Sequence, residues 1–258
     1  MNNQKSLNIV SDPSRWNASR LGFWSAILLI IITIICFGMA ATTFPITGPL
    51  CSENCISYPY NGPVDNAAHG FFWMIPGLFI APLFLILVAC LYQVVPMEVK
   101  VYSLIALVFA AIYAGLMSLN YFIQLETVWP SIMKGETEGL ALITHYNPHG
   151  IFIAMEDLGY LTMSLSFIFS GLSVLGKTGL ERAIRWLLII AGLSAIGLYP
   201  VYSLYYGYDL DYRFEVLIIS ITWMVSIAAG ILFAFYFRRL KKSYQKPSLP
   251  GMDKPKTV

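Results

Sequence analysis

Two adjacent acidic residues, Glu156 and Asp157, lie within a long apolar stretch of this 258-residue sequence. A helix that began near Pro148 would carry their carboxyls about 12 Å along its axis, at roughly 1.5 Å per residue. An acid at that depth in a membrane is costly, so it needs a partner, a proton or water. We therefore expect the pair to form a site for a cation, a proton or a small polar ligand.

Further polar residues occur at helical spacing around this pair. Tyr160 lies four residues after Glu156 and shares its helix face, and Asn120 and Gln124 share a face of the preceding apolar stretch. Consecutive helices often pack together, which predicts an acidic pocket between the third and fourth spans that opens to the outer side. In the alternative interpretation, these groups only form hydrogen bonds between helices. The candidate ligand-binding residues are Asn120, Gln124, Glu126, Glu156, Asp157 and Tyr160, with His149 on the same face as Glu156.

The three histidines, His69, His145 and His149, all fall near the predicted outer side. Histidine is the commonest metal ligand, and a nearby carboxylate could complete a metal site. A metal could activate water there, or a haem could be held between His69 and His149. Pro148 disfavours helix at Asn147, so His145 and His149 do not form a helical His-x-x-x-His motif. A metal- or haem-dependent enzyme or redox subunit is therefore an alternative function, although we expect no cofactor.

Cysteine spacing and missing motifs bear on the remaining alternatives. Cys51 and Cys55 lie in a predicted outer loop, where an oxidising environment would favour a disulfide between them. The sequence contains no Gly-rich phosphate loop, no helical His-Glu-x-x-His motif and no Gly-x-Ser-x-Gly elbow. These absences favour a non-enzymatic role and indicate no catalytic residue. A non-catalytic membrane subunit or scaffold is the third possible function.

The elements that must position these residues are long apolar helices. The sequence is 57% hydrophobic and 12% charged, whereas soluble domains carry roughly 25% charged residues. A run of about 20 apolar residues is long enough to cross a bilayer as a helix. We predict an all-α, polytopic integral membrane bundle with six transmembrane helices. The apolar runs cover residues 21–44, 70–95, 101–125, 149–175, 186–206 and 215–237.

The basic residues predict the orientation of this bundle. With six spans, 14 of the 16 Lys and Arg residues fall on the side that holds both termini. The positive-inside rule then places both termini in the cytoplasm, as in a multi-pass protein of the plasma membrane. The net charge of only +2 gives no reason to expect nucleic acid as a partner.

The predicted organisation is one membrane domain flanked by two polar segments. Residues 1–20 form a cytoplasmic segment, residues 21–240 form the six-helix domain, and residues 241–258 form a disordered basic cytoplasmic tail. The outer loops cover about 45–69, 126–147 and 207–214. We expect the bilayer as a partner, with anionic lipid at the basic cluster of Arg238, Arg239, Lys241 and Lys242.

Overall fold

The structure, a computed structural model, describes residues 13–43, 46–52, 55–60 and 67–244, and side chains of the last range from residue 70 onward. Its described part is all-helical, with no strand. Six helical segments there are long and apolar enough to cross a membrane, so the predicted multi-pass bundle is confirmed at this level. These segments are Pro13–Ala41, Gly70–Val94, Met97–Lys134, Ile151–Ser173, Gly179–Asp209 and Arg213–Tyr244.

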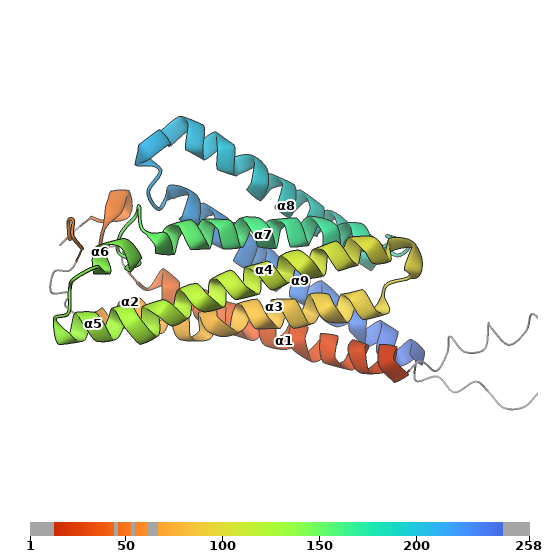
Figure 1. The fold of residues 1–258 in the computed structure, drawn as a ribbon. Helices are drawn as coiled ribbons and strands as arrows, with labels where there is room; N and C mark the ends of the chain where they lie inside the picture. The colour runs from red at the N-terminus through yellow and green to blue at the C-terminus, as the bar shows by residue number, and fades with distance from the viewer. Residues whose placement is uncertain (1–12, 44–45, 53–54, 61–66, 245–258) are drawn as a thin grey trace, which may run out of the picture.

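Six long helices form the body of the molecule, and short helices occupy the connections (Figure 1). The long helices are α1 (Pro13–Ala41), α3 (Met74–Val94), α4 (Lys100–Ile123), α7 (Ile151–Ser173), α8 (Gly179–Tyr206) and α9 (Arg213–Tyr244). The short ones are η2 (Gly48–Leu50), α2 (Ala67–Phe72), η3 (Met97–Val99), the π-helical turn η4 (Gln124–Val128), α5 (Trp129–Lys134), α6 (Leu140–Ile143) and η5 (Gly207–Asp209).

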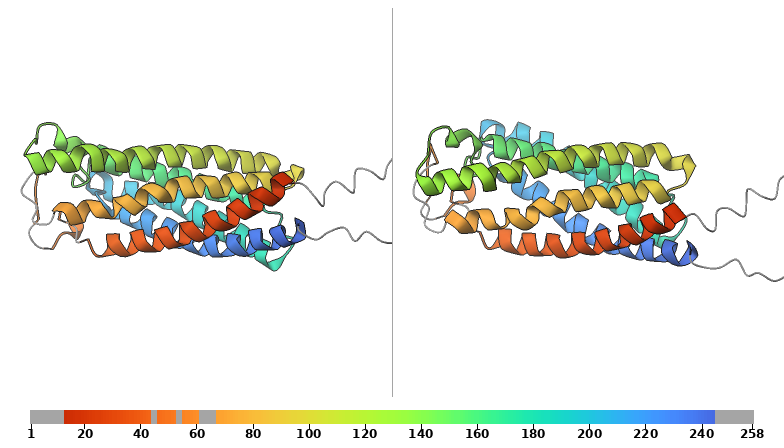
Figure 2. Two further views of the ribbon diagram at one scale, coloured as in Figure 1. Left: turned by 90° about the horizontal axis from the view of Figure 1, so that it is seen from below. Right: turned by 60° about the horizontal axis from the view of Figure 1, so that its bottom comes forward.

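The helices run lengthwise, so the molecule has two distinct ends (Figures 1 and 2). We call the end that holds α2, α5, α6 and η5 the site end, and the end that holds Pro13 and Tyr244 the terminal end. Helix α4 packs on α7, α1 packs on both α3 and α9, and α8 packs on α7. Towards the site end, α8 diverges from the other helices (Figure 1).

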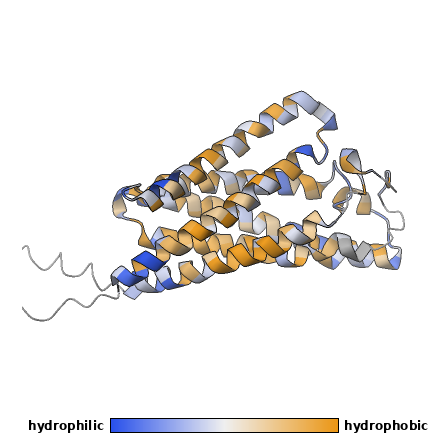
Figure 3. Cartoon of the chain, turned by 180° about the vertical axis from the view of Figure 1, so that it is seen from behind, coloured by the Kyte–Doolittle hydropathy of each residue, from blue (hydrophilic) through white to orange (hydrophobic). Residues whose placement is uncertain are grey.

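The helix surfaces are apolar in the manner of membrane spans. Hydrophobic residues colour the helices along most of their length, and hydrophilic residues gather near the ends (Figure 3). Large side chains such as Leu119, Ile190 and Leu193 are more than half exposed on the surface of the bundle. A helix that is hydrophobic all round is buried either in a large core or in a bilayer. The bilayer is therefore the partner that covers these exposed faces.

Two glycines allow α7 and α8 to approach each other closely. A Cβ atom at Gly192 would lie 2.5 Å from the Ser164 carbonyl oxygen, and one at Gly171 would lie 2.8 Å from the Arg185 carbonyl oxygen. Neither backbone could move away without disturbing its helix. Small residues at such crossings are how membrane helices pack without side chains between them.

Several element boundaries differ from the sequence prediction. The third span continues through η4 and α5 to Lys134, so residues 126–134 are helical rather than loop. Helix α7 begins at Ile151 and not at Pro148, because the Asn147 side chain accepts a hydrogen bond from the His149 backbone nitrogen at 2.9 Å. This Asx turn holds the chain out of the helix until Gly150.

The first helix begins at Pro13, ahead of the predicted residue 21, and α9 extends to Tyr244. The predicted segment before residue 13 and the predicted tail after residue 244 lie outside the described residues. Pro13 and Tyr244 lie at the same end of the bundle, as six spans require (Figure 2). The side of the membrane on which this end lies stays a prediction.

Candidate functional site

A pair of buried carboxyls links α7 to α9 towards the site end. Glu156 on α7 is fully buried, and Glu215 on α9 is 8% exposed. The two carboxyls are close enough to interact through a side-chain hydrogen bond. A carboxylate only accepts hydrogen bonds, so a bond between two carboxyls requires a proton on at least one of them. Glu156 Oε2 has no donor among the described residues, so a protonated Glu215 carboxyl could supply one.

The other oxygen of Glu156 accepts the last hydrogen bond of a chain that involves side chains from three helices. Tyr121 on α4 donates its hydroxyl to Glu156 Oε1 at 2.7 Å. The Tyr121 and Tyr160 hydroxyl oxygens lie 3.3 Å apart, and Trp223 Nε1 on α9 donates to the Tyr160 hydroxyl at 3.0 Å. Because the indole only donates, the order of donation runs from Trp223 through Tyr160 and Tyr121 to Glu156. All four side chains are buried, so this chain fixes their relative positions.

A cavity of about 340 Å³ lies beside this pair at the site end, and Glu215 forms part of its wall. Six aromatic side chains line it, together with the imidazole of His145. Glu156 is not among the lining residues, so Glu215 is the carboxyl of the pair that faces the space. The aromatic residues of the wall are Phe37, Trp73, Tyr146, Phe152, Tyr212 and Trp223.

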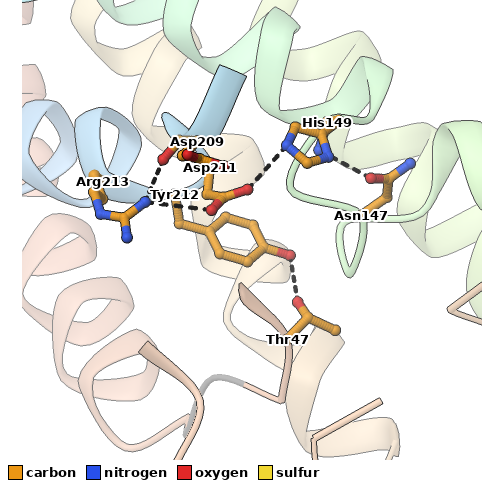
Figure 4. A network of polar contacts seen from close by, with 7 residues as sticks. All are labelled: Thr47, Asn147, His149, Asp209, Asp211, Tyr212 and Arg213. Carbon is orange, nitrogen blue, oxygen red and sulfur yellow. Dashed lines mark hydrogen bonds and ion pairs between the residues drawn. The ribbon is translucent and has the colours of Figure 1, made fainter. Parts of the chain in front are cut away.

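A network of polar contacts joins the connecting segments at the site end (Figure 4), and two of its residues, Thr47 and Tyr212, line the cavity. Tyr212 donates its hydroxyl to the His145 carbonyl oxygen at 3.1 Å, and its oxygen lies 2.6 Å from Thr47 Oγ1. Because the Tyr212 proton is used in the first bond, Thr47 donates in the second. These bonds join the α8–α9 connection to the segment before η2 and to the segment between α6 and α7.

An exposed ion pair reinforces this junction. His149 Nε2 lies 3.0 Å from Asp211 Oδ1, and Arg213 lies 3.3 Å from Asp211 Oδ2 (Figure 4). Arg213 also donates to the Asp209 carbonyl oxygen. The guanidinium is therefore engaged by the α8–α9 connection and is not among the residues that line the cavity.

His145 lines the cavity as a neutral group. Its backbone nitrogen donates to Gln124 Oε1 at 3.0 Å, and Gln124 Nε2 donates to the Ile143 carbonyl oxygen at 2.6 Å. Desolvation lowers the pKa of His145 to about 3. An imidazole with that pKa is uncharged at neutral pH, so His145 supplies no positive charge opposite Glu215.

Two polar atoms near the cavity have no protein partner. The Tyr146 hydroxyl is buried on the cavity wall without a hydrogen bond. Burial raises the pKa of Tyr146 above its usual range, so the hydroxyl keeps its proton and can donate it. Asp157 Oδ1 is likewise buried without a donor, next to Glu156 in the chain. Buried polar atoms are normally satisfied, and of these two only the Tyr146 hydroxyl lines the cavity, so it is available to a ligand or to water.

The predicted ligand-binding residues have several different surroundings among the described residues, and their role in binding stays a prediction. Asn120 Nδ2 donates to the Phe152 carbonyl oxygen at 3.0 Å, so it ties α4 to α7 as the structural alternative proposed. Gln124 holds the segment before α7, and Glu126 is exposed on η4. None of the residues predicted to bind ligand lines the cavity. Only Glu156 and Tyr160 belong to the hydrogen-bonded chain beside it.

The predicted metal and disulfide residues have different surroundings. His145 is enclosed and His149 is 61% exposed in its pair with Asp211, while the side chain of His69 lies outside the described part. Within the described residues, no group of three or more His, Cys, Asp or Glu could hold a metal ion. Cys51 and Cys55 are joined by a disulfide.

Glu215, Tyr121 and Trp223 were not singled out by sequence reasoning. Glu215 carried a usable signal, because it is an ionisable residue at the start of an otherwise apolar span. Tyr121 and Trp223 carried none, since aromatic residues are common in membrane spans and their partners come from other helices.

The carboxyl pair and the cavity are the features of this chain from which chemistry can be argued. The cavity combines an aromatic wall with a single acidic residue among the described residues that line it. Comparisons with protein-family models, with curated proteins and with solved structures find no match. The functional argument therefore rests on the geometry of the site.

Proposed function

We propose that this membrane protein binds a small organic cation in the cavity, with the cation next to Glu215. The observation that carries the proposal is a carboxyl, more than nine-tenths buried, on the wall of an aromatic cavity. Aromatic faces attract a desolvated cation with about 2 kcal/mol, and a carboxylate supplies the matching charge. This combination is typical of sites that recognise amines and quaternary ammonium groups.

The charges around the cavity support a cationic ligand over an anionic one. The residues that line the cavity include no Lys or Arg, and His145 is neutral. Arg213 is engaged by Asp209 and Asp211 outside the cavity. An anion would therefore meet the Glu215 carboxyl without a compensating charge.

The lining supports an organic cation over a metal ion. Hard metal ions take six or more oxygen ligands, or at least several carboxylates. Glu215 is the only acidic residue among those that line the cavity, whereas six of them are aromatic. The free Tyr146 hydroxyl adds one hydrogen-bond donor for a polar substituent on the ligand.

Benzyltrimethylammonium tests the proposal, because it combines a permanent positive charge with an aromatic ring. Trp73 and Trp223 line the cavity, so binding to the purified full chain in a neutral detergent should change the tryptophan fluorescence. We expect Glu215→Gln to weaken binding roughly thirtyfold, which corresponds to about 2 kcal/mol for a lost charge-assisted contact.

Two controls separate this site from general charge attraction. Glu138→Gln removes an exposed carboxyl at the same end and should bind like the wild type. Neopentylbenzene, the uncharged carbon isostere, should compete poorly. Equal affinity of wild type and Glu215→Gln, or no binding by the wild type, would contradict the proposal.

The proposal includes the orientation and the membrane predicted from the sequence. Both termini then lie in the cytoplasm, and the cavity opens to the outer face of the plasma membrane. Arg238, Arg239 and Lys242 are exposed at the end of α9, where anionic headgroups of the inner leaflet would meet them. The supporting observation is the concentration of basic residues at the terminal end.

A further inference from the structure

We infer that each cation bound next to Glu215 displaces one proton from that carboxyl, so that the site exchanges a cation for a proton. This inference rests on the proposed function and adds a coupling that cation binding alone does not require. It follows from three features: the two carboxyls are close enough to form a hydrogen bond, the described residues around them include no basic group that is charged at neutral pH, and only one of the two faces the cavity.

Among the described residues, the surroundings of the pair provide no positive charge. Tyr121 and Asp157 are the other ionisable side chains that act on the two carboxyls, and neither is basic. Two carboxylates at hydrogen-bonding distance cannot both stay ionised without compensation. An uncompensated charge inside a membrane bundle is costly, so the empty site holds protons in place of a cation.

Other titratable groups face the pair from several elements without changing this balance. None of them is a cation at neutral pH, since thiols and phenols are neutral there and His145 has a pKa of about 3. They are Cys36 from α1, Tyr113 and Tyr121 from α4, Asp157 and Tyr160 from α7, and His145 and Tyr212 at the cavity.

The exchange is balanced in charge and in hydrogen bonds. The Glu215 carboxylic acid loses its proton to water through the cavity, and its carboxylate then pairs with the incoming cation. Glu156 keeps its proton and donates it to Glu215, while Tyr121 still donates to Glu156 Oε1. One positive charge enters and one leaves, so the buried site stays neutral throughout.

Calorimetry with benzyltrimethylammonium measures this proton directly. The probe is permanently charged and releases no proton itself at any pH. The full chain in neutral detergent would be titrated at pH 6 in two buffers with different ionisation enthalpies. We expect the two heats of binding to differ by the difference between the buffers' ionisation enthalpies, which corresponds to one proton released per ligand bound. The affinity should also fall about tenfold for each pH unit of acidification in this range.

Variants and outcomes distinguish this inference from the proposed function. Glu156→Gln keeps the wall carboxyl and should still release one proton, and Glu138→Gln should match the wild type. Binding with equal heats in both buffers and no pH dependence would overturn the exchange but leave the proposed function standing. If Glu156→Gln bound the probe without releasing a proton while the wild type released one, the released proton could not be assigned to Glu215. Absence of binding by the wild type would overturn both.

Discussion

At the scale of residues, the arrangement around Glu156 explains how a carboxyl can lie in the centre of a membrane bundle. Tyr121 donates to one of its oxygens, and Glu215 bonds to the carboxyl from α9. A buried carboxyl without these partners would cost several kcal/mol. The chain through Tyr160 to Trp223 also leaves each hydroxyl with a defined direction of donation. The proposed function and the stability of the bundle therefore involve the same side chains.

Removing one hydroxyl from this chain tests its contribution to stability. Tyr121→Phe leaves Glu156 Oε1 without its donor, and we expect the free energy of unfolding to fall by about 1 kcal/mol. Hydrogen bonds to charged groups contribute roughly 1.5–3 kcal/mol in soluble proteins, whereas polar contacts in membrane proteins average about 0.6 kcal/mol. Reversible unfolding in mixed detergent micelles measures the difference.

Tyr102→Phe is the matched control for that measurement. Tyr102 is on the same helix, but it is 39% exposed on the bundle surface. Its substitution should change the unfolding free energy by less than about 0.5 kcal/mol. Equal losses for the two variants would show that the bond to Glu156 contributes nothing specific.

At the scale of elements, the long helices were predictable and their connections were not. Apolar length alone predicts α1, α3, α4, α7, α8 and α9, because a bilayer requires about 20 such residues per span. The extension of the third span through Trp129 and Lys134 was missed, since the apolar run was taken to end at residue 125 and the outer loop to begin at about residue 126. Glu126 lies in the π-helical turn η4 and Pro130 in the first turn of α5, and neither residue ends the helix.

The location of the candidate site was predictable only in part, because it depends on which helices pack together. Adjacency in the chain suggested that α4 and α7 would form the pocket, and these helices do pack together. The cavity instead lies beside α1 and α9, the first and last helices. A contact between helices that do not follow each other in the chain, such as α7 and α9, has no signature in local spacing, so Glu215 could not be matched to Glu156 from the sequence.

A substitution at Gly48 tests whether the position of the Tyr212 ring matters for the cavity. This residue has φ +68°, and a Cβ atom there would lie 2.8 Å from the Tyr212 ring. Hydrogen bonds to Thr47 and His145 hold that ring, so Gly48→Ala must displace it. We expect faster amide hydrogen exchange in residues 207–212 and several-fold weaker binding of benzyltrimethylammonium.

Gly135→Ala separates displacement of the ring from backbone strain. Gly135 has φ +74°, and a Cβ atom there would have no neighbour within 4 Å. Both substitutions carry the strain of a left-handed alanine, about 1 kcal/mol, but only Gly48→Ala meets Tyr212. Exchange rates in 207–212 that rise equally in both variants would argue against the role given to Tyr212.

At the scale of the whole molecule, the two ends differ in charge and in structure. The terminal end carries the basic residues that close α9, and the site end carries the cavity and the disulfide of Cys51 and Cys55. Disulfides form in oxidising compartments, and basic segments stay in the cytoplasm. These two tendencies are independent of each other, and both favour an outer location for the site end.

Cysteine labelling on intact cells tests this orientation. Cys36 and Cys90 are buried and Cys51 is bonded to Cys55, so a membrane-impermeant maleimide should leave the wild type unlabelled. Met133→Cys introduces a thiol at the site end, on a position that is 67% exposed. We expect intact cells to label this variant, because its thiol lies in the outer medium.

Gly179→Cys introduces the matching thiol at the terminal end, where a side chain meets no neighbour within 4 Å. It should be labelled only after the cells are permeabilised, because the α7–α8 connection is predicted to be cytoplasmic. The reverse pattern would place the cavity on the cytoplasmic side. The cation would then be drawn from the cell interior, and Glu215 would exchange its proton with the cytoplasm rather than with the outer medium.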